Sequence, residues 1–179
     1  TSTTLTDLLQ PDRFPVVATG RGGQLTYHGP GQRVIYPMLD LGRRGRDIRR
    51  YVEALERWAI AALADLGIRA GPSRLGTGIW VEDTRSPGRL LKIGAIGVRV
   101  RRWVSFHGLA LNVATDLSHF DTIVPCGIIG HGVARACDLK AGLDMALLDR
   151  ALFNRLSVLL HSLSGPAMPA IKTLEDARD

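Results

Sequence analysis

The sequence predicts a single α+β domain, of the broad α/β class, in which a mixed β-sheet is flanked by helices. Strand-like apolar segments occupy the middle of the chain, and amphipathic helical patterns lie on either side of them, over 47–66 and 143–163. The length of 179 residues suits one domain, and no internal repeat or low-complexity linker divides it. We therefore expect residues 1–179 to form one domain.

The first part of the chain contains short segments around a glycine-rich stretch. We expect residues 1–13 to be poorly structured, and 14–18 and 33–41 to form strands. Between these strands, residues 20–31 contain five glycines in twelve positions, which makes a helix improbable. Such a loop lets the backbone approach a ligand closely, although a purely structural loop would have the same composition.

The helix over 48–66 is the most regular pattern in the chain. Its apolar residues recur at helical spacing, Asp47 precedes them as a candidate N-cap, and Gly67 follows as a candidate C′ residue.

Three further strands are expected after this helix. They cover 78–82, 90–103 and 104–113, with a turn at 85–88 and a tight connection around Arg101 and Arg102.

The last part of the chain is expected to be irregular and then helical. Residues 116–120 indicate a turn or a short helix, and 123–129 a buried irregular or strand-like stretch. One amphipathic helix then runs over 143–163 and ends at Gly165-Pro166.

Composition excludes some classes of protein. The longest apolar run is 58–64, whereas a membrane-spanning helix needs about 20 residues. Two cysteines and the absence of a signal-like start favour a reduced, cytoplasmic protein. The net charge of +6 suits an acidic partner, which could be nucleic acid, anionic lipid or an acidic protein.

Two residues are candidates for chemistry. Cys126 lies between Pro125 and Gly127, which could present its thiol at a turn, although a free cysteine is more often a small buried hydrophobe. Cys137 lacks this context and is interpreted as structural. Lys92 is a lone cation in an apolar, glycine-rich strand, and it points either into a site or, at a sheet edge, to water.

Two other groups of residues are less specific. The histidines His28, His107 and His131 match no compact metal-ligand spacing, so no metal is expected. The run Arg43, Arg44, Arg46, Arg49 and Arg50 is either a solvated face or a docking surface for an acidic protein.

Four motifs occur in one order along the chain, and together they resemble the octanoyltransferase family of lipoate biosynthesis, the lipoyl(octanoyl) transferases. They are Arg21-Gly22-Gly23-Gln24-x-Thr26-Tyr27-His28-Gly29-Pro30-Gly31-Gln32, Lys92-Ile93-x-Ala95-Ile96-Gly97, Phe106-His107-Gly108-x-Ala110-x-Asn112 and Pro125-Cys126-Gly127-Ile128. The resemblance implies a fold similar to the catalytic domains of biotin and lipoate protein ligases. It also implies a segment before the glycine-rich loop that this sequence does not contain.

The resemblance assigns roles to particular residues. It implies that Cys126 is the nucleophile that carries the acyl group as a thioester, and that Lys92 activates this thiol and acts as acid and base. It implies neither a cofactor nor a metal. It further implies that the acyl and thioester pocket is lined by Arg21, Gly22, Gly23, Gln24, Leu25, Thr26, Tyr27, His28, Ala95, Ile96, Gly97, Gly108, Leu109 and Ala110.

The implied reaction transfers an octanoyl group between two proteins. The donor would be octanoyl-acyl carrier protein. The acceptor would be a lysine of apo lipoyl domains, those of 2-oxoacid dehydrogenase E2 subunits and the glycine cleavage H protein. Two alternatives are an ATP-dependent lipoate or biotin ligase, which would not need Cys126, and a basic nucleic-acid-binding module. The second is disfavoured because no aromatic residue alternates with the arginines of 43–50.

Overall fold

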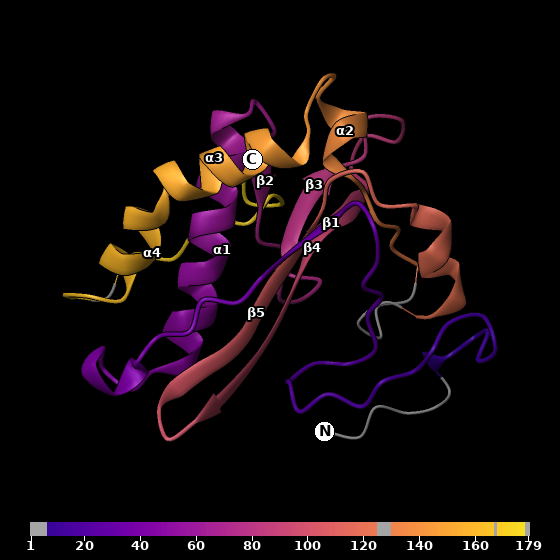
Figure 1. The fold of residues 1–179 in the computed structure, drawn as a ribbon. Coiled ribbons are helices and arrows are strands. Elements are labelled where there is room, and N and C mark those ends of the chain that lie inside the picture. The colour runs from indigo at the N-terminus through magenta and orange to yellow at the C-terminus, as the bar shows by residue number, and fades with distance from the viewer. Residues whose placement is uncertain (1–6, 125–129, 167, 178–179) are drawn as a thin grey trace.

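The computed structural model describes residues 7–124, 130–166 and 168–177, and its centre is a five-stranded antiparallel sheet (Figure 1). The strands lie in the order β1-β5-β4-β3-β2. Their bounds are β1 Gln32–Ile35, β2 Ala70–Gly71, β3 Ile79–Glu82, β4 Leu90–Arg101 and β5 Val104–Asn112.

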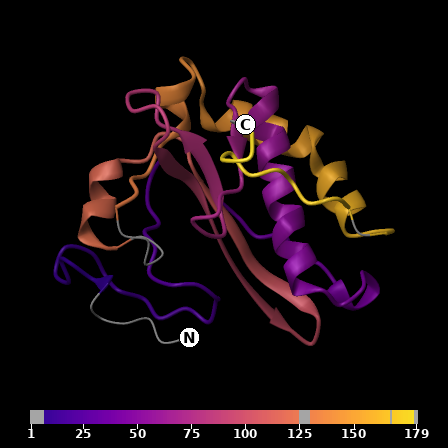
Figure 2. The same ribbon diagram turned by 180° about the vertical axis from the view of Figure 1, so that it is seen from behind.

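The longer helices lie on one side of this sheet. Figures 1 and 2 show α1 (Ile48–Asp65), α3 (Met145–Asn154) and α4 (Leu156–Ser162) on that side, and the glycine-rich segment on the other. The shorter helical elements are η2 (Leu41–Arg43), η3 (Leu117–Thr122) and α2 (Ala136–Leu139). The α+β class with flanking helices is therefore confirmed.

The sequence predicts a mixed sheet, whereas the strands of the observed sheet are antiparallel. All pairings among β1 to β5 are antiparallel. A parallel bridge joins Lys92 to Val133, but Val133 lies in a segment outside the named strands. This bridge fixes the chain that follows residue 130 beside β4.

The predicted first helix is confirmed at both ends. The Asp47 carboxylate accepts a hydrogen bond from the Arg50 backbone N–H at 3.0 Å, and Gly67 has a φ of +78°. The buried face of α1, which includes Tyr51, Leu55 and Trp58, packs against the sheet and against α3 and α4. The main hydrophobic core thus lies on the side of the sheet opposite the glycine-rich segment.

The tight connection between β4 and β5 is also confirmed. Arg102 and Trp103 both have positive φ values, 51° and 64°, which is typical of a type I′ hairpin turn. The Leu41 N–H donates to the Trp103 carbonyl at 2.7 Å, so η2 lies against the tip of this hairpin.

The prediction of one helix over 143–163 is wrong. Two helices, α3 and α4, meet at Arg155, whose guanidinium binds the Asp65 carboxylate through two nitrogens. This salt bridge connects Arg155, which lies between α3 and α4, to Asp65 at the C-terminal end of α1. A periodic apolar pattern cannot show such a break, because both helices continue to face the same core.

Two predictions for the N-terminal part are also wrong. Residues 14–18 form no strand, because Pro15 has no N–H and Val16 and Val17 are exposed. Residues 8–10 are not unstructured, since the Leu9 and Gln10 N–H groups donate to the Thr122 carbonyl at 2.8 and 3.1 Å.

The strand predicted over 33–41 is shorter than expected. It ends at Ile35, because Pro37 cannot continue the hydrogen-bond ladder and Asp40 forms only an isolated bridge with Val104. The short helix considered at 116–120 is present as η3, with the Asp116 carboxylate accepting from the Ser118 N–H at 3.0 Å.

Candidate active site

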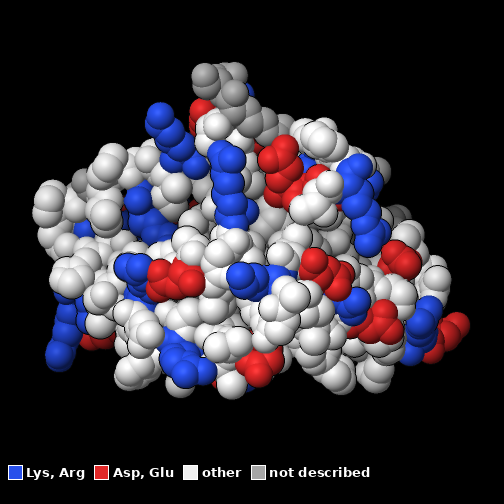
Figure 3. All heavy atoms as spheres, turned by 90° about the horizontal axis from the view of Figure 1, so that it is seen from above, with Lys and Arg blue, Asp and Glu red and all other residues white. Residues whose placement is uncertain are grey.

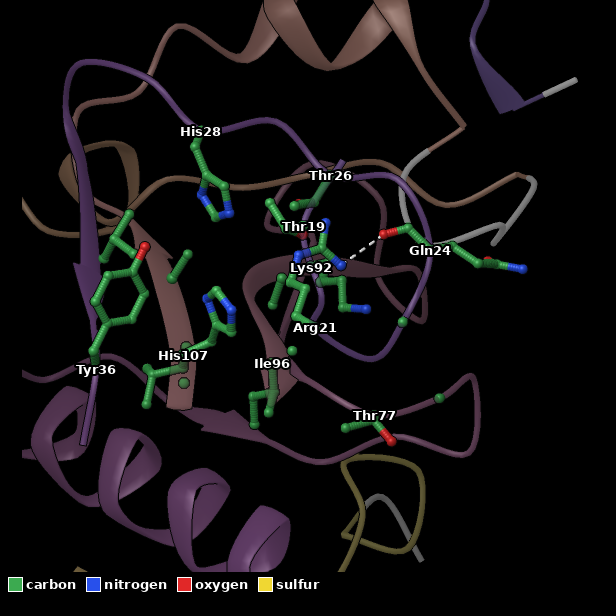
Figure 4. A pocket seen from close by; sticks show the side chains of 18 of the residues that line it. Thr19, Arg21, Gln24, Thr26, His28, Tyr36, Thr77, Lys92, Ile96 and His107 are labelled. Carbon is green, nitrogen blue, oxygen red and sulfur yellow. Dashed lines mark hydrogen bonds between the residues drawn. The ribbon is translucent and has the colours of Figure 1, made fainter. Parts of the chain in front are cut away.

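A pocket of about 340 Å³ lies between the glycine-rich segment and the face of the sheet that α1 does not cover (Figure 4). Its floor comes from β4 and β5, and further walls come from residues 19–28 and from the loop before β3. The pocket is lined by Thr19, Arg21, Gly23, Gln24, Thr26, His28, Val34, Tyr36, Leu75, Gly76, Thr77, Lys92, Ala95, Ile96, Gly97, His107, Gly108, Leu109 and Ala110.

Glycines allow the loop to lie directly on β4. The Gly22 N–H donates to the Val98 carbonyl at 2.9 Å. A Cβ at Gly97 would lie 3.1 Å from the Gly22 carbonyl oxygen and 2.9 Å from Cδ of Arg21. Arg21 donates from its guanidinium to the Gln24 carbonyl of the same loop at 2.9 Å (Figure 4). The glycine content of 20–31 therefore serves a close backbone contact that forms one wall of the pocket.

A bulge in β4 directs Lys92 toward this pocket. Trp80 of β3 pairs with Lys92, but its neighbour Ile79 pairs with Gly94, so that Ile93 is an extra residue in β4. Lys92 consequently lies on the same face of the sheet as Trp80, whereas Ile93 belongs to the hydrophobic core beneath α1.

Lys92 is buried rather than exposed at a sheet edge. Its relative exposure is 7%, and β4 is an interior strand of the sheet. The ammonium nitrogen lies 5.1 Å from the centre of the Trp80 ring, within the range of a cation–π interaction. The alternative of a solvent-facing edge lysine is therefore excluded.

The segment that follows residue 130 is hydrogen-bonded to Lys92 through the backbone. The Lys92 N–H donates to the Gly132 carbonyl, and the Ala134 N–H donates to the Lys92 carbonyl, both at 3.0 Å. The side-chain amide of Asn112 donates to the Ala134 carbonyl, also at 3.0 Å. Lys92 is thus fixed between β3 and residues 132–134.

A chain of side-chain hydrogen bonds connects this segment to the glycine-rich loop. The Gln32 amide nitrogen donates to Asn112 Oδ1 at 2.9 Å, and Gln32 Oε1 lies 2.7 Å from His28 Nδ1. The contact is a hydrogen bond if that His28 nitrogen carries the proton. These bonds fix His28 at the pocket wall.

The rim of the pocket near β1 is fixed by backbone contacts of Pro37. Its carbonyl accepts hydrogen bonds from the Tyr51 and Ser105 hydroxyls, both at 2.8 Å. Burial raises the pKa of Tyr51, and its contact with Ser105 acts in the opposite direction. Tyr36, which directly precedes Pro37, lies edge-on to His107 with ring centres 5.7 Å apart.

Most of the expected binding residues come together here, and three do not. Gly22, Leu25 and Tyr27 are outside the pocket lining. Tyr27 packs instead with Phe14, His119 and Phe120, and its hydroxyl lies 2.7 Å from His119 Nδ1. Tyr27 therefore anchors the loop against η3.

Sequence reasoning missed several lining residues, namely Thr19, Val34, Tyr36, Leu75, Gly76, Thr77 and His107. His107 was available from its motif, and it lies within β5 with a positive φ of 59°, which is uncommon for a residue other than glycine. The loop 75–77 had no comparable signal, because only the chain's return toward β3 brings it to the pocket.

The structure describes only one of the two cysteines, Cys137. Cys126 lies outside the described residues. Cys137 is partly buried in α2; its backbone N–H donates to the Val113 carbonyl at 3.0 Å, and its sulfur lies 3.7 Å from Asp138 Oδ1. Cys137 does not line the pocket, in agreement with its interpretation as structural.

Neither a metal centre nor a membrane-spanning helix is found in the part of the chain that the structure describes. No group of three or more potential ligands is clustered there. No helix there is both long and apolar enough to cross a bilayer.

The arginine run does not form one uniform surface. Arg50 is committed to the fold, because it donates to the carbonyls of Ser162, Gly165 and Pro166. Arg43 is exposed beside Asp40. Arg46 lies over the Trp103 ring, so the run adjoins the exposed Arg101 and Arg102 of the hairpin tip. On the face seen from above, basic and acidic side chains are interleaved (Figure 3).

Comparisons with known proteins agree with this geometry. Residues 3–157 match the model of the lipoyl protein ligase A/B catalytic domain. The chain is 59% identical over 154 residues to an octanoyltransferase of Maricaulis maris, covering 85% of this chain and 67% of that protein. It is also 59% identical over 154 residues to an octanoyltransferase of Rhodospirillum rubrum, covering 86% of this chain and 70% of that protein.

Solved structures share the fold at low sequence identity. A putative lipoate protein ligase from T. acidophilum with bound lipoic acid superimposes with a TM-score of 0.57 at 21% identity, over 79% of this chain and 56% of that one. Biotin protein ligase from Aquifex aeolicus superimposes with a TM-score of 0.54 at 12% identity, over 73% and 53%. The chain thus covers little more than half the length of either ligase.

Proposed function

Since the chain belongs to the octanoyltransferase family of acyltransferases, which has the lipoyl protein ligase A/B catalytic domain, we propose that it transfers an octanoyl group from octanoyl-acyl carrier protein to a lysine of a lipoyl domain. The observation that carries the proposal is the buried Lys92, which lines the pocket and is hydrogen-bonded through its backbone to residues 132–134. Cys126, the proposed nucleophile, precedes that segment in the chain by only a few residues.

The apolar part of the pocket supports an acyl substrate. Val34, Leu75, Ile96 and Leu109 contribute aliphatic side chains to the lining. An octanoyl chain bound there would be removed from water, which is the main favourable contribution to binding an apolar ligand. The thioester end would then lie toward Lys92.

The first step of the proposed reaction forms an acyl-enzyme. The Cys126 thiolate attacks the thioester carbonyl of the donor, a new carbon–sulfur bond forms, and the donor's carbon–sulfur bond breaks. The Lys92 ammonium stabilises the attacking thiolate and supplies the proton for the departing thiol. One thioester replaces another, so the step needs no ATP.

The second step releases the product amide. The amine of the acceptor lysine attacks the acyl-enzyme carbonyl, and the Cys126 thiolate leaves. The proton lost by the amine passes to neutral Lys92, which restores the ammonium. Conversion of a thioester to an amide makes this step favourable.

The proposed partners are two proteins, an acidic carrier protein as donor and a lipoyl domain as acceptor. Acyl carrier protein would approach the basic surface formed by Arg43, Arg46, Arg101 and Arg102, and the acceptors would be lipoyl domains of 2-oxoacid dehydrogenases and of the glycine cleavage system. The cytoplasm, where both kinds of partner are made in bacteria, is the proposed location.

The test uses the purified chain with octanoyl-acyl carrier protein and an apo lipoyl domain, with and without ATP. Mass spectrometry should show one octanoyl group on the acceptor, equally in both conditions. An acceptor that is modified only with free octanoate or lipoate and ATP would identify a ligase instead. An acceptor that remains unmodified with octanoyl-acyl carrier protein, and also with free octanoate or lipoate and ATP, would contradict both functions.

A further inference from the structure

A carboxylate is buried beneath the candidate active site, on the helix that covers the other side of the sheet. Glu56 of α1 has a relative exposure of 8%, and its neighbours on the helix, Leu55 and Ala59, belong to the hydrophobic core. A glutamate is rarely buried to this extent unless a partner compensates the loss of hydration.

The hydrogen-bond partner of Glu56 is a residue that also touches Lys92. Oε1 of Glu56 accepts from the Gly78 backbone N–H at 3.0 Å. Gly78 has a φ of +137°, and a Cβ there would lie 2.5 Å from Cε of Lys92 and 2.8 Å from the Gly94 carbonyl oxygen. Gly78 is thus in contact with the aliphatic part of the Lys92 side chain, and the Glu56 carboxylate holds it there.

The charges around Glu56 connect it to Lys92 in a second way. Burial raises the pKa of Glu56, whereas the Gly78 N–H and the positive charges of Lys92 and Arg57 lower it, and the Glu53 carboxylate raises it further. Among the described residues, no carboxylate comes within salt-bridge distance of the Lys92 ammonium.

We propose that Glu56 is a positioning residue for Lys92. Its carboxylate fixes Gly78 against the lysine side chain and provides a buried negative charge that attracts the Lys92 side chain at the pocket. The contacts hold whatever the reaction is, and only the catalytic consequence rests on the proposed octanoyl transfer.

A hydrogen bond alone does not account for a glutamate at this position. A glutamine would offer its amide carbonyl oxygen as the acceptor for the Gly78 N–H without the penalty of a buried charge. The variant Glu56→Gln therefore separates the charge from the hydrogen bond, and Glu56→Asp retains the charge on a shorter side chain. Glu53→Gln is the matched control, because it removes an exposed carboxylate from the same helix.

The first measurement is the reactivity of Lys92 toward an amine-acylating reagent, followed by peptide mass spectrometry. The chain contains only three lysines, so Lys140 and Lys172 serve as internal references in every sample. Loss of the nearby negative charge frees the Lys92 side chain, and Glu56→Gln should raise the labelling rate of Lys92 by about tenfold relative to the references. Glu53→Gln and Glu56→Asp should leave that ratio near the wild-type value. An unchanged ratio in Glu56→Gln, or an equal rise in Glu56→Asp, would overturn the proposal.

The second measurement is the single-turnover rate of octanoyl transfer to the protein from octanoyl-acyl carrier protein. Glu56→Gln should lower this rate by about tenfold while the KM for the donor stays near the wild-type value, because the pocket lining is unchanged. Wild-type activity in Glu56→Gln would overturn the catalytic role of the charge. Absence of transfer by the wild-type chain would instead contradict the proposed function, and the labelling measurement would still decide the role of Glu56.

Discussion

Lys92 and Trp80 face each other across the β3–β4 pair, with the ammonium nitrogen 5.1 Å from the centre of the indole ring. The bulge at Ile93 produces this arrangement, because without it the alternation of side chains would place Lys92 and Trp80 in a different register. A cation over an aromatic face is attracted by the negative face of the ring. The Lys92 side chain is therefore held at the pocket by contact with an aromatic face.

The first prediction concerns Lys92 and the reactivity of Cys126. Replacement of Lys92 by alanine should slow alkylation of Cys126 near neutral pH by about tenfold, because a nearby ammonium favours the reactive thiolate. Peptide mass spectrometry follows each cysteine separately, and Cys137, which is outside the pocket lining, should keep its rate. A Cys126 rate that does not change would show that Lys92 does not activate the thiol.

The second prediction concerns Gly78. In Gly78→Ala the new methyl group would meet Cε of Lys92 and the Gly94 carbonyl, and the φ of +137° would be strained for alanine. We expect a loss of about 3 kcal/mol in the free energy of unfolding, measured by urea denaturation, together with loss of octanoyl transfer.

Gly142→Ala is the matched control for this variant. Gly142 also has a positive φ, 76°, but no atom of the described residues other than its chain neighbours lies within 4 Å of a Cβ there. It should lose only about 1 kcal/mol and retain transfer. Equal effects in the two variants would mean that the crowding at Lys92 is unimportant.

The third prediction is a pH dependence of stability that originates in Glu56. Its folded-state pKa is raised above the usual value of 4.5 by burial, so the folded state binds a proton before the unfolded state does. Between the raised pKa and pH 4.5, the stability contributed by this group increases as the pH falls, and it is lost as the pH rises through the folded-state pKa.

The variant Glu56→Gln lacks this group and should lack this contribution. Thermal unfolding should show that the variant is at least as stable as the wild type at neutral pH. Toward pH 4.5 the stability of the wild type should increase relative to that of the variant. Parallel stability curves for the two proteins would contradict a buried carboxylate.

The fourth prediction concerns the basic surface beside the hairpin tip. Arg43→Glu combined with Arg102→Glu should lower kcat/KM for octanoyl-acyl carrier protein and spare a small octanoyl thioester, because the surface accelerates encounter with an acidic protein. The effect should weaken with added salt. Arg85→Glu combined with Arg150→Glu changes the net charge equally at other exposed positions. If the two pairs of substitutions have the same effect, or both donors respond alike, the surface has no specific role.

Local signals predicted much of the fold. The cap at Asp47, the glycine at position 67 and the apolar periodicity between them fix α1, since each acts within a few residues. The same reasoning found the β4–β5 hairpin. It did not find the break at Arg155, whose side chain pairs with Asp65, ninety positions earlier in the chain.

The candidate site was predictable where a motif was present. Lys92 and the glycine-rich segment were singled out from composition and spacing, and the structure brings them to one pocket. Glu56 and the loop 75–77 were not, because a charged residue in an amphipathic helix is normally taken to face water. Only the packing of α1 against β3 shows that its carboxylate reaches Gly78.

The most direct test of the proposed mechanism is the intact mass of the protein after mixing with octanoyl-acyl carrier protein in the absence of an acceptor. We expect one octanoyl adduct on the wild type and on Cys137→Ser, no adduct on Cys126→Ser, and loss of the adduct when an apo lipoyl domain is added. An adduct that persists in Cys126→Ser, or octanoyl transfer by that variant at the wild-type rate, would contradict a thioester on Cys126.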